Sequence, residues 1–292
     1  MPAPHFDYLA PTTVDEAVAA LVKGGQDARI MAGGTDLMVK IRHRALFPKQ
    51  LISLKRIEGL DAITFDEKSG LTIGATALLA DVASDPMIRK HYPTVAEAAE
   101  STANVQVRNM GTVVGNLCNA SPSADNAPTL IAMDATVNIT GPSGTRSMPL
   151  DTFFRGPGIT ALENGEIVTS IFVPTPPAGT GTAYISVSQR GQLDCSAIGL
   201  GAKVTVDGDR CTDARIVVGA CAPIPMRAKD AEKMLVGQEL TDDQIRKAAK
   251  KTSEETSPID DVRASAAYRL KVTAVITIRA LTDARKMAKR NK

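Results

Sequence analysis

The most informative stretch of this 292-residue sequence is Ile30-Met-Ala-Gly-Gly-Thr-Asp-Leu37. An apolar run, residues 28–32, ends at two adjacent glycines, and Thr35-Asp36 then precedes a second apolar run, residues 37–41. This order predicts a short strand, a tight turn and the start of a helix. Adjacent glycines let backbone N–H groups converge on one point and let a ligand approach closely. With the Thr35 hydroxyl and the positive end of the helix dipole, the turn suits an anion such as a phosphate.

Taken alone, this turn has two interpretations: a phosphate site, or a plain Gly-Gly turn with a capping threonine, which is the commoner case. A second stretch, Val107-Arg-Asn-Met-Gly-Thr-Val-Val-Gly-Asn-Leu117, favours the phosphate site. Its glycines flank the hydroxyl of Thr112, and an amide side chain follows at Asn116. Two such loops are suited to the two phosphates of a dinucleotide. Asp125 opens a predicted helix, either as an ordinary N-terminal charge or as a carboxylate for a ribose hydroxyl.

Other chemistry finds little support in the sequence. The dinucleotide fingerprint of the Rossmann fold is absent: its nearest match, Gly199-Leu-Gly201, precedes a predicted strand rather than a helix. There is no Walker A loop and no G-x-S-x-G elbow, and the three histidines have no partner at metal-ligand spacing. We therefore expect a binding site with no catalytic dyad and no metal ligands in this chain.

Further elements follow from local patterns. A capping box, Thr13-Val-Asp-Glu16, predicts a helix that ends at Gly24-Gly25. Up to the linker predicted at residues 174–181, the other expected elements are strands at 50–54, 71–74 and 135–140, helices at 94–101 and 124–133, and a Gly/Pro/Ser loop at 141–147. Beyond the linker we expect strands at 182–189, 195–206 and 211–221 and helices at 227–235, 241–252 and 262–288. The pattern predicts an α+β C-terminal domain of three antiparallel strands backed by helices.

Composition excludes several classes of protein. Hydrophobic residues make up 43% of the chain and charged residues 23%, which is typical of a globular protein. A net charge of +2 and an aromatic content of 3% argue against a nucleic-acid partner. The four cysteines form no C-x-x-C pair, which argues against a metal or iron–sulfur centre held by this chain and favours a reducing compartment. With neither a secretory signal nor a membrane span visible, we expect a cytoplasmic protein.

The paired motifs Ala32-Gly-Gly-Thr-Asp36 and Arg108-Asn-Met-Gly-Thr-Val-Val-Gly-Asn116 resemble those of the FAD-binding (medium) subunit of molybdenum hydroxylases. This family includes xanthine dehydrogenase, aerobic carbon monoxide dehydrogenase and nicotinate dehydrogenase. The resemblance extends over essentially the whole chain. Further matching segments are Leu71–Thr76, Asp134–Val137, Phe153-Phe154, Gly165–Val168 and Tyr268-Arg269.

The resemblance implies an α+β fold with an FAD-binding domain of the vanillyl-alcohol-oxidase (PCMH) type. That domain would span residues 1–176, with subdomains at about 1–57 and 58–176, and a C-terminal domain of the CO dehydrogenase flavoprotein type would span 177–292. The resemblance also implies the cofactor-binding residues. They are Ile30, Met31, Ala32, Gly33, Gly34, Thr35, Asp36 and Leu37 around the pyrophosphate; Thr112, Val113, Val114, Gly115 and Asn116 on the diphosphate and flavin side; Ala103 and Asp125 along the cofactor; Val168 at the adenine end; and Ser186 where a strand passes the flavin.

Two residues depart from the family pattern. Val114 stands where the second loop commonly has a glycine, so this loop must differ in local geometry or sit slightly back from the ligand. Ser186 stands where a lysine is common. The four-cysteine cluster insert of medium subunits of the hydroxybenzoyl-CoA reductase kind is absent, which disfavours that relative.

The implied activity is electron transfer within a complex. A large subunit would hold the molybdenum cofactor and hydroxylate the substrate, and a small subunit would pass electrons through 2Fe–2S clusters to FAD in this chain. The final acceptor would be NAD, a quinone or another carrier, and the assembly a dimer of heterotrimers. Two alternatives remain at this point: a stand-alone flavin oxidase and a flavin-free assembly module. We expect no substrate hydroxylation by this chain alone.

Overall fold

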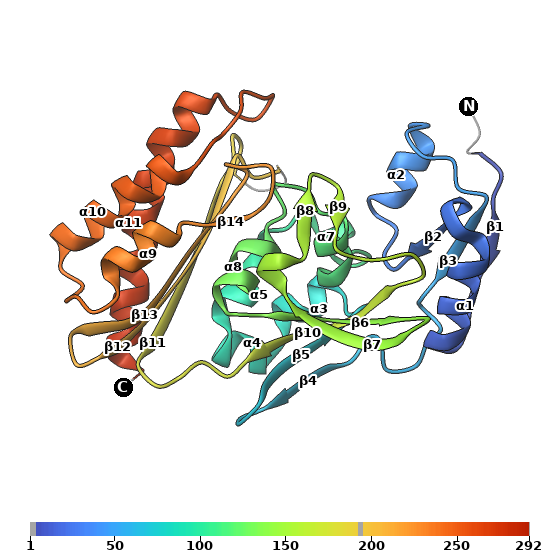
Figure 1. Ribbon diagram of the computed structural model, residues 1–292, viewed down its shortest axis with the longest axis horizontal. Coiled ribbons are helices and arrows are strands. Elements are labelled where there is room, and N and C mark those ends of the chain that lie inside the picture. Colours follow the sequence, from blue (N-terminus) through green and yellow to red (C-terminus); the bar gives the residue numbers. More distant parts are fainter. Residues whose placement is uncertain (1–3, 192–194, 292) are drawn as a thin grey trace.

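The computed structural model describes residues 4–191 and 195–291. Three main sheets follow one another along the chain, and a two-stranded sheet, β8-β9, is the fourth. Figure 1 shows the N-terminal sheet at one end, the five-stranded sheet in the middle and the C-terminal sheet with its helices at the other end. None of the helices in these ranges is both long and apolar enough to cross a membrane.

The first sheet is parallel and has the strand order β1-β3-β2. Its elements are β1 (Asp7–Leu9), α1 (Val14–Gly24), the short 3-10 helix η1 (Gly25–Asp27), β2 (Ala28–Met31), α2 (Leu37–Arg42) and β3 (Gln50–Ser53). The predicted capping box is present: Thr13 Oγ1 accepts from Glu16 N at 3.2 Å, and the Glu16 carboxylate accepts from Thr12 N at 2.8 Å. The predicted strand, turn and helix at residues 28–41 are confirmed as β2, the glycine turn and α2.

The second sheet is antiparallel, with the order β4-β5-β10-β6-β7. Its strands are β4 (Ile63–Asp66), β5 (Gly70–Gly74), β6 (Thr136–Gly141), β7 (Gly144–Pro149) and β10 (Ile167–Pro174). The loop predicted at 141–147 is wrong: only Pro142 and Ser143 form the turn, and β7 pairs with β6 along its whole length. The polar composition of β7 resembles a loop because β7 is an edge strand with one face in solvent.

Helices cover this sheet and lead toward the cleft described below. They are α3 (Leu79–Ser84), α4 (Pro86–His91), α5 (Pro93–Ser101), α6 (Val105–Arg108), α7 (Val113–Cys118) and α8 (Asn126–Ala132). The segment after β7 forms the 3-10 helix η2 (Leu150–Thr152) and the strands β8 (Phe154–Gly156) and β9 (Ile159–Thr160). The helices predicted at 94–101 and 124–133 correspond to α5 and α8. Fully buried residues such as Ile73, Leu130 and Val137 form one continuous core beneath them.

The C-terminal sheet has the order β11-β12-β13-β14. Its strands are β11 (Thr180–Val187), β12 (Ile198–Asp207), β13 (Arg210–Gly219) and β14 (Met226–Arg227), and its helices are α9 (Lys229–Leu235), α10 (Asp242–Glu255) and α11 (Ala266–Arg290). The three predicted antiparallel strands are confirmed. The helix predicted to begin at residue 227 begins at Lys229, because Met226 and Arg227 pair with β13 as a fourth strand.

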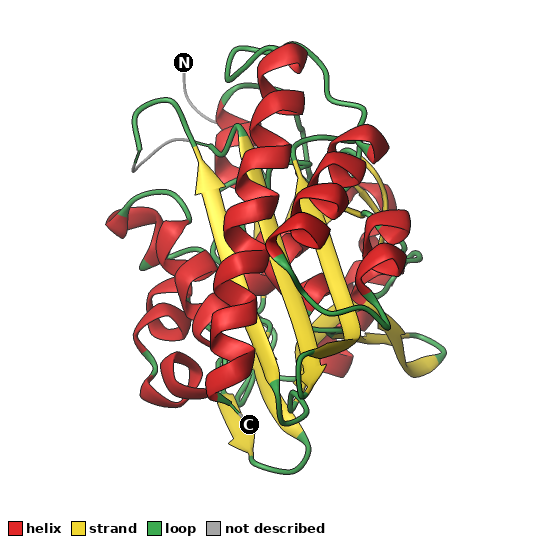
Figure 2. Cartoon of the chain, turned by 90° about the vertical axis from the view of Figure 1, so that its left-hand side faces the viewer, coloured by secondary structure: helices red, strands yellow, loops and turns green. Residues whose placement is uncertain are grey.

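Helix α11 lies across the C-terminal sheet (Figure 2). Gly181 in β11 faces it so closely that a Cβ there would lie 3.0 Å from the Ala284 carbonyl carbon. The chain passes from the second sheet to this one between Pro174 and Thr180, within the stretch predicted as a linker. The predicted domain division at residue 176 stays a prediction.

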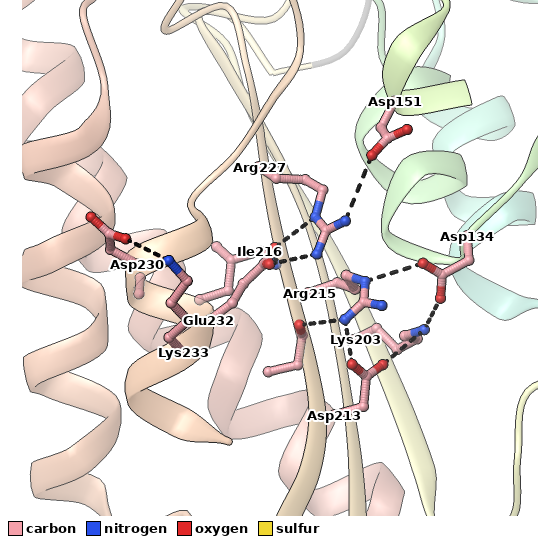
Figure 3. A network of polar contacts seen from close by, with 12 residues as sticks. Asp134, Asp151, Lys203, Asp213, Arg215, Ile216, Arg227, Asp230, Glu232 and Lys233 are labelled. Atoms are coloured by element: carbon pink, nitrogen blue, oxygen red, sulfur yellow. Dashed lines mark hydrogen bonds and ion pairs between the residues drawn. The ribbon is translucent and has the colours of Figure 1, made fainter. Parts of the chain in front are cut away.

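An ionic network fixes the C-terminal sheet against the end of α8 (Figure 3). Lys203 of β12 pairs with Asp134 and with Asp213, the second at 3.2 Å, and Arg215 of β13 pairs with Asp134 at 3.1 Å. Arg227 bonds Glu232 at 2.7 Å and approaches Asp151 of η2 at 3.6 Å. The sheet is therefore tied to two segments that follow the two glycine-containing loops in the chain.

Candidate cofactor site

A cleft with a volume of about 650 Å³ lies where the two glycine-containing loops meet. Its walls come from distant parts of the chain, including Val168 at the start of β10, Asp125 ahead of α8 and Cys195 ahead of β12. A volume of this size falls within the range of sites for cofactors and other small molecules. The cleft therefore gathers the two loops singled out in the sequence into one site.

The first loop connects the end of β2 to the start of α2. A Cβ on Gly33 would lie 2.7 Å from Gly111 Cα and even closer to the Met110 carbonyl oxygen. Gly33 thus allows the two loops to touch, a tighter constraint than the ligand approach expected from the sequence. None of the hydrogen bonds found among the described residues uses the backbone N–H of Gly33, Gly34 or Thr35. Three donors are therefore available to an anion in the cleft.

The second loop leads into α7, whose N-cap is Thr112. The Thr112 Oγ1 accepts from Gly115 N at 2.9 Å, so the hydroxyl caps the helix. The first-turn N–H group of Val114 has no acceptor in the hydrogen bonds among the described residues, as is usual at a helix start. Val114 lines the cleft although its side chain is almost fully buried. The valine side chain at this helix start is thus part of the hydrophobic core.

A carboxylate lies in the wall at Asp125, which is 7% exposed. Its Oδ1 accepts a hydrogen bond from the Tyr184 hydroxyl at 3.0 Å and another from the Ser196 hydroxyl. Burial raises the pKa of Asp125 above its ordinary value, and the hydrogen bonds from Ser196 and Tyr184 oppose that rise in part. Burial, followed by the nearby charge of Asp125, raises the pKa of Tyr184 well above its ordinary value. The C-terminal sheet thus completes the wall around Asp125.

Another part of the wall contains Glu166, next to Val168. Both carboxylate oxygens of Glu166 accept from Arg146 of β7, at 2.6 and 2.7 Å. These bonds hold the pKa of Glu166 below its ordinary value. From α2, Lys40 Nζ donates to Asn119 Oδ1 at 2.6 Å, and both residues line the cleft. Both pairs therefore hold cleft-lining side chains in place.

Of the residues proposed from the sequence, all line the cleft except Val113 and Ser186. The Val113 side chain is fully buried in the core, so only its backbone can reach a ligand. Ser186 is exposed on β11 and contacts Ser196 rather than the cleft. Cleft residues that sequence reasoning missed include Arg29, Lys40, Leu54, Thr102, Cys118, Asn119, Ser121, Ser123, Leu162, Glu166 and Cys195. Side chains alternate between the two faces of a strand, so Tyr184 and Ser186 lie on the same face of β11. This alternation is the sequence feature from which their shared position near Asp125 could have been predicted.

The chemistry of the cleft fits a ligand with two neighbouring negative charges. Unused backbone donors at two touching loops suit two adjacent phosphates, and the carboxylate of Asp125 suits a hydroxyl or an N–H group. The glycine turn follows a strand of a three-stranded parallel sheet, outside any Rossmann fingerprint. Fold and site together define a dinucleotide-binding protein of non-Rossmann type.

Comparison with known proteins identifies the family. Residues 4–176 match the family described as the FAD binding domain in molybdopterin dehydrogenase, and residues 183–284 match the CO dehydrogenase flavoprotein C-terminal domain. The chain belongs to this family, the FAD-binding medium subunits of molybdenum hydroxylases, which are oxidoreductase subunits. The resemblance inferred from the two loop motifs is confirmed.

Individual relatives are similar over nearly their whole length. The carbon monoxide dehydrogenase medium chain of Hydrogenophaga pseudoflava is 34% identical over 281 residues, which cover 96% of this chain and 97% of the relative. The glyceraldehyde dehydrogenase medium chain of Sulfolobus acidocaldarius is 32% identical, covering 96% and 98%. Among solved structures, a CO dehydrogenase of H. pseudoflava that lacks the Mo-pyranopterin moiety superposes with a TM-score of 0.93 at 36% identity, covering 97% of this chain and 98% of that one. Quinoline 2-oxidoreductase from Pseudomonas putida 86 gives 0.90 at 30% identity, covering 99% of both chains.

Proposed function

We propose that this chain is the FAD-carrying electron-transfer subunit of a molybdenum hydroxylase complex. It takes electrons from 2Fe–2S clusters of a small partner subunit and passes them to an external acceptor such as NAD or a quinone. The observation that carries the proposal is that two touching loops, both with backbone N–H groups that have no acceptor among the described residues, line one cleft. The flavin supplies the chemistry that this role needs, because it accepts electrons singly and gives them up singly or as a pair.

The residues of the chain bind and orient the cofactor. The N–H groups of Gly33, Gly34 and Thr35 hold one phosphate, and the start of α7 at Thr112 holds the other. Asn116 holds the flavin side: its Oδ1 is fixed by the Asn126 amide at 3.1 Å, which leaves its amide nitrogen free to face the cleft. Val168 meets the adenine end, as the family resemblance implies.

Asp125 and Ala103 also line the cleft and would lie along the cofactor, as the family resemblance implies. The remaining predicted residues, Ile30, Met31, Ala32, Asp36, Leu37, Val114 and Gly115, complete the walls. The protein's contribution is to position the cofactor, exclude water and tune the ring, so substrate hydroxylation belongs to a partner subunit.

Partners follow from the same role. A large subunit would hold the molybdenum cofactor, and the small subunit and this chain would complete a heterotrimer that pairs into a dimer. The relatives of this chain include the medium chains of two dehydrogenases, and this supports such an assembly. The cytoplasm is the proposed compartment: all four cysteines are free thiols, and two of them are buried.

The first test is a visible absorption spectrum of the gently purified full chain, with chromatography of the chromophore released on denaturation. We expect one equivalent of FAD, bound non-covalently. A flavin-free chain that also fails to take up added FAD would contradict the proposal. Flavin mononucleotide is the matched control: it lacks the adenylate half and the second phosphate, so it should bind much more weakly.

A second test examines the subunit role. Coexpression with an iron–sulfur and a molybdenum subunit should yield a stable complex in which the flavin is reduced when substrate reaches the large subunit. Substrate hydroxylation by the purified single chain, without molybdenum or iron, would instead favour a stand-alone flavin oxidase.

A further inference from the structure

Three hydroxyl or carboxyl groups form a continuous line from the protein surface to the cleft. Ser186 is exposed on β11, and its Oγ lies 2.6 Å from Oγ of Ser196. Ser196, which is 2% exposed, bonds through the same Oγ to Oδ1 of Asp125. Asp125 in turn lines the cofactor cleft. The line thus runs from an exposed hydroxyl to two buried groups, Ser196 at 2% and Asp125 at 7% exposed.

The hydrogen bonds along this line all point the same way. A carboxylate can only accept, so the Ser196 hydroxyl must donate its single proton to Asp125. With that proton used, Ser196 can only accept from Ser186, and the Ser186 hydroxyl is left to accept from water. A shift of one proton along each bond therefore moves a net proton from solvent to Asp125.

Asp125 is suited to take up that proton. None of the described side chains that contact it carries a positive charge; they are Tyr184, Ser196 and, more weakly, Ser186. Burial without a cation favours the neutral acid, so its pKa is raised. The hydrogen bonds from Tyr184 and Ser196 both fall on Oδ1.

The proposed function needs a supply of protons to the cofactor cleft. Iron–sulfur clusters deliver one electron each and no proton, whereas two-electron reduction of FAD to the anionic hydroquinone consumes two electrons and one proton. The electrons come from the partner's clusters, and the proton has to come from elsewhere. We propose that Ser186, Ser196 and Asp125 form a proton relay that carries this proton from solvent to the cofactor cleft. The relay rests on the function proposed above.

The test uses the full chain loaded with FAD and reduced in a stopped-flow instrument by reduced methyl viologen, a one-electron donor that carries no proton. We expect Ser186→Ala and Ser196→Ala to slow full reduction of the flavin by roughly tenfold or more, since positioned proton transfer commonly contributes on the order of 10² or more. Ser186→Thr keeps the hydroxyl and should restore the rate. Ser188→Ala is the matched control, because the Ser188 hydroxyl lies on the same segment but donates to Gly191 O.

A second readout needs no flavin. In the flavin-free chain, carbon-13 NMR of the Asp125 carboxyl should show a further rise of its pKa in Ser196→Ala, because a donor to the charged form is lost. An unchanged carboxyl titration in Ser196→Ala would contradict the contact itself. Reduction rates in Ser186→Ala and Ser196→Ala equal to that of the parent, with FAD fully bound, would overturn the relay and leave the proposed function intact. Failure of the parent to bind FAD would instead overturn the proposed function.

Discussion

Gly33 shows how one missing side chain sets the geometry of the site. The backbone of Met110 and Gly111 occupies the place where its Cβ would be. The first loop therefore rests directly on the second, and residues of both loops line one cleft. Any side chain at Gly33 has to move backbone atoms, which is costlier than moving a flexible side chain.

We predict that Gly33→Ala separates the two loops and weakens both FAD binding and the fold. The expected loss is about 1–3 kcal/mol in the free energy of unfolding, as for other overpacked sites. Urea denaturation of the flavin-free chain measures this loss, and flavin retention on gel filtration measures the binding. Gly156→Ala is the control, because a Cβ there meets only Ile159 at 3.6 Å and the change should be nearly neutral. A Gly33→Ala variant with parental stability would refute the backbone contact.

Asp125 predicts a dependence of stability on pH. Its pKa is raised in the folded chain, mainly by burial, from an ordinary value of 3.8. Below that value the residue is neutral in both folded and unfolded states. As pH rises from there to the folded pKa, the unfolded chain ionises first, so the folded state loses stability, and the loss is constant above.

Asp125→Asn removes this ionisation and keeps a hydrogen-bond acceptor for Tyr184. We therefore expect the variant to be more thermally stable than the parent at pH 7, with the difference shrinking to nothing as pH falls below about 4. Thermal midpoints of the flavin-free chain between these limits measure the effect. A difference that grows toward acid pH would show that the shift of the Asp125 pKa has the opposite sign.

At the scale of single elements, α11 is anchored by its buried Arg269. This side chain is 1% exposed, and its guanidinium bonds the carbonyl oxygens of Ala197 and Ile259 and the carboxylate of Asp261. Burial alone would raise the pKa of Asp261, but Arg269 and two backbone N–H groups outweigh it and hold that pKa far below its usual range. The anchor joins the start of α11 to the segment before β12, next to Ser196.

Replacing Arg269 with methionine should cost about 3–5 kcal/mol in the free energy of unfolding, since it leaves buried acceptors and a carboxylate without their donor. Urea denaturation at pH 7 measures the cost. Arg279→Met, on the exposed face of the same helix, is the control and should change stability by less than about 0.5 kcal/mol. Because the Asp261 pKa is lowered, the stability that this pair contributes should be lost as pH falls below the ordinary value of 3.8.

The sequence patterns predicted elements of this kind where periodicity or end signals were strong. The capping box at Thr13 and the three long strands of the C-terminal sheet correspond to observed elements. Strand β14 was missed because two residues carry no periodicity, and β7 was missed because an edge strand rich in Gly, Ser and Thr has the composition of a loop. The composition of a short segment does not show whether another strand pairs with it, because the partner strand can be distant in the sequence.

At the scale of the whole molecule, the C-terminal sheet is locked to the rest by charge. Lys203 is only 6% exposed and serves two carboxylates, Asp134 and Asp213. Burial alone would raise the pKa of Asp213, yet the neighbouring Lys203 and Arg215 lower it overall. The stabilisation from this network is therefore present near neutral pH and is lost as pH falls below the ordinary value of 3.8.

We predict that Lys203→Met uncouples the two parts of the molecule. Removing one partner of a buried ion group costs about 3–5 kcal/mol, and the cleft wall around Asp125 should loosen with it. In urea, flavin release and loss of helical circular dichroism should coincide in the parent and separate in the variant, with flavin leaving first. Lys233→Met, which removes an exposed lysine paired with Asp230, should keep the two transitions together. Coincident transitions in Lys203→Met would argue against the coupling.

Separation along the chain explains which residues of the site could be predicted from the sequence. The two loops carry glycines and capping residues in a short, local order that is visible in the sequence. The contacts of Tyr184 and Ser196 with Asp125 span 59 and 71 residues and follow no local pattern. They depend on how the C-terminal sheet packs on α8, where Gly201 leaves just enough room for the backbone at Pro128.

This long reach across the chain sets an order of events during synthesis. The glycine turn leaves the ribosome early, but the wall around Asp125 stays open until Ser196 has been made, about 160 residues later. At typical elongation rates of about 5–20 residues per second, that interval lasts on the order of ten to thirty seconds. The nascent protein therefore exposes an unfinished cleft throughout, and we expect the cofactor to be captured only once the last sheet has folded onto the first two.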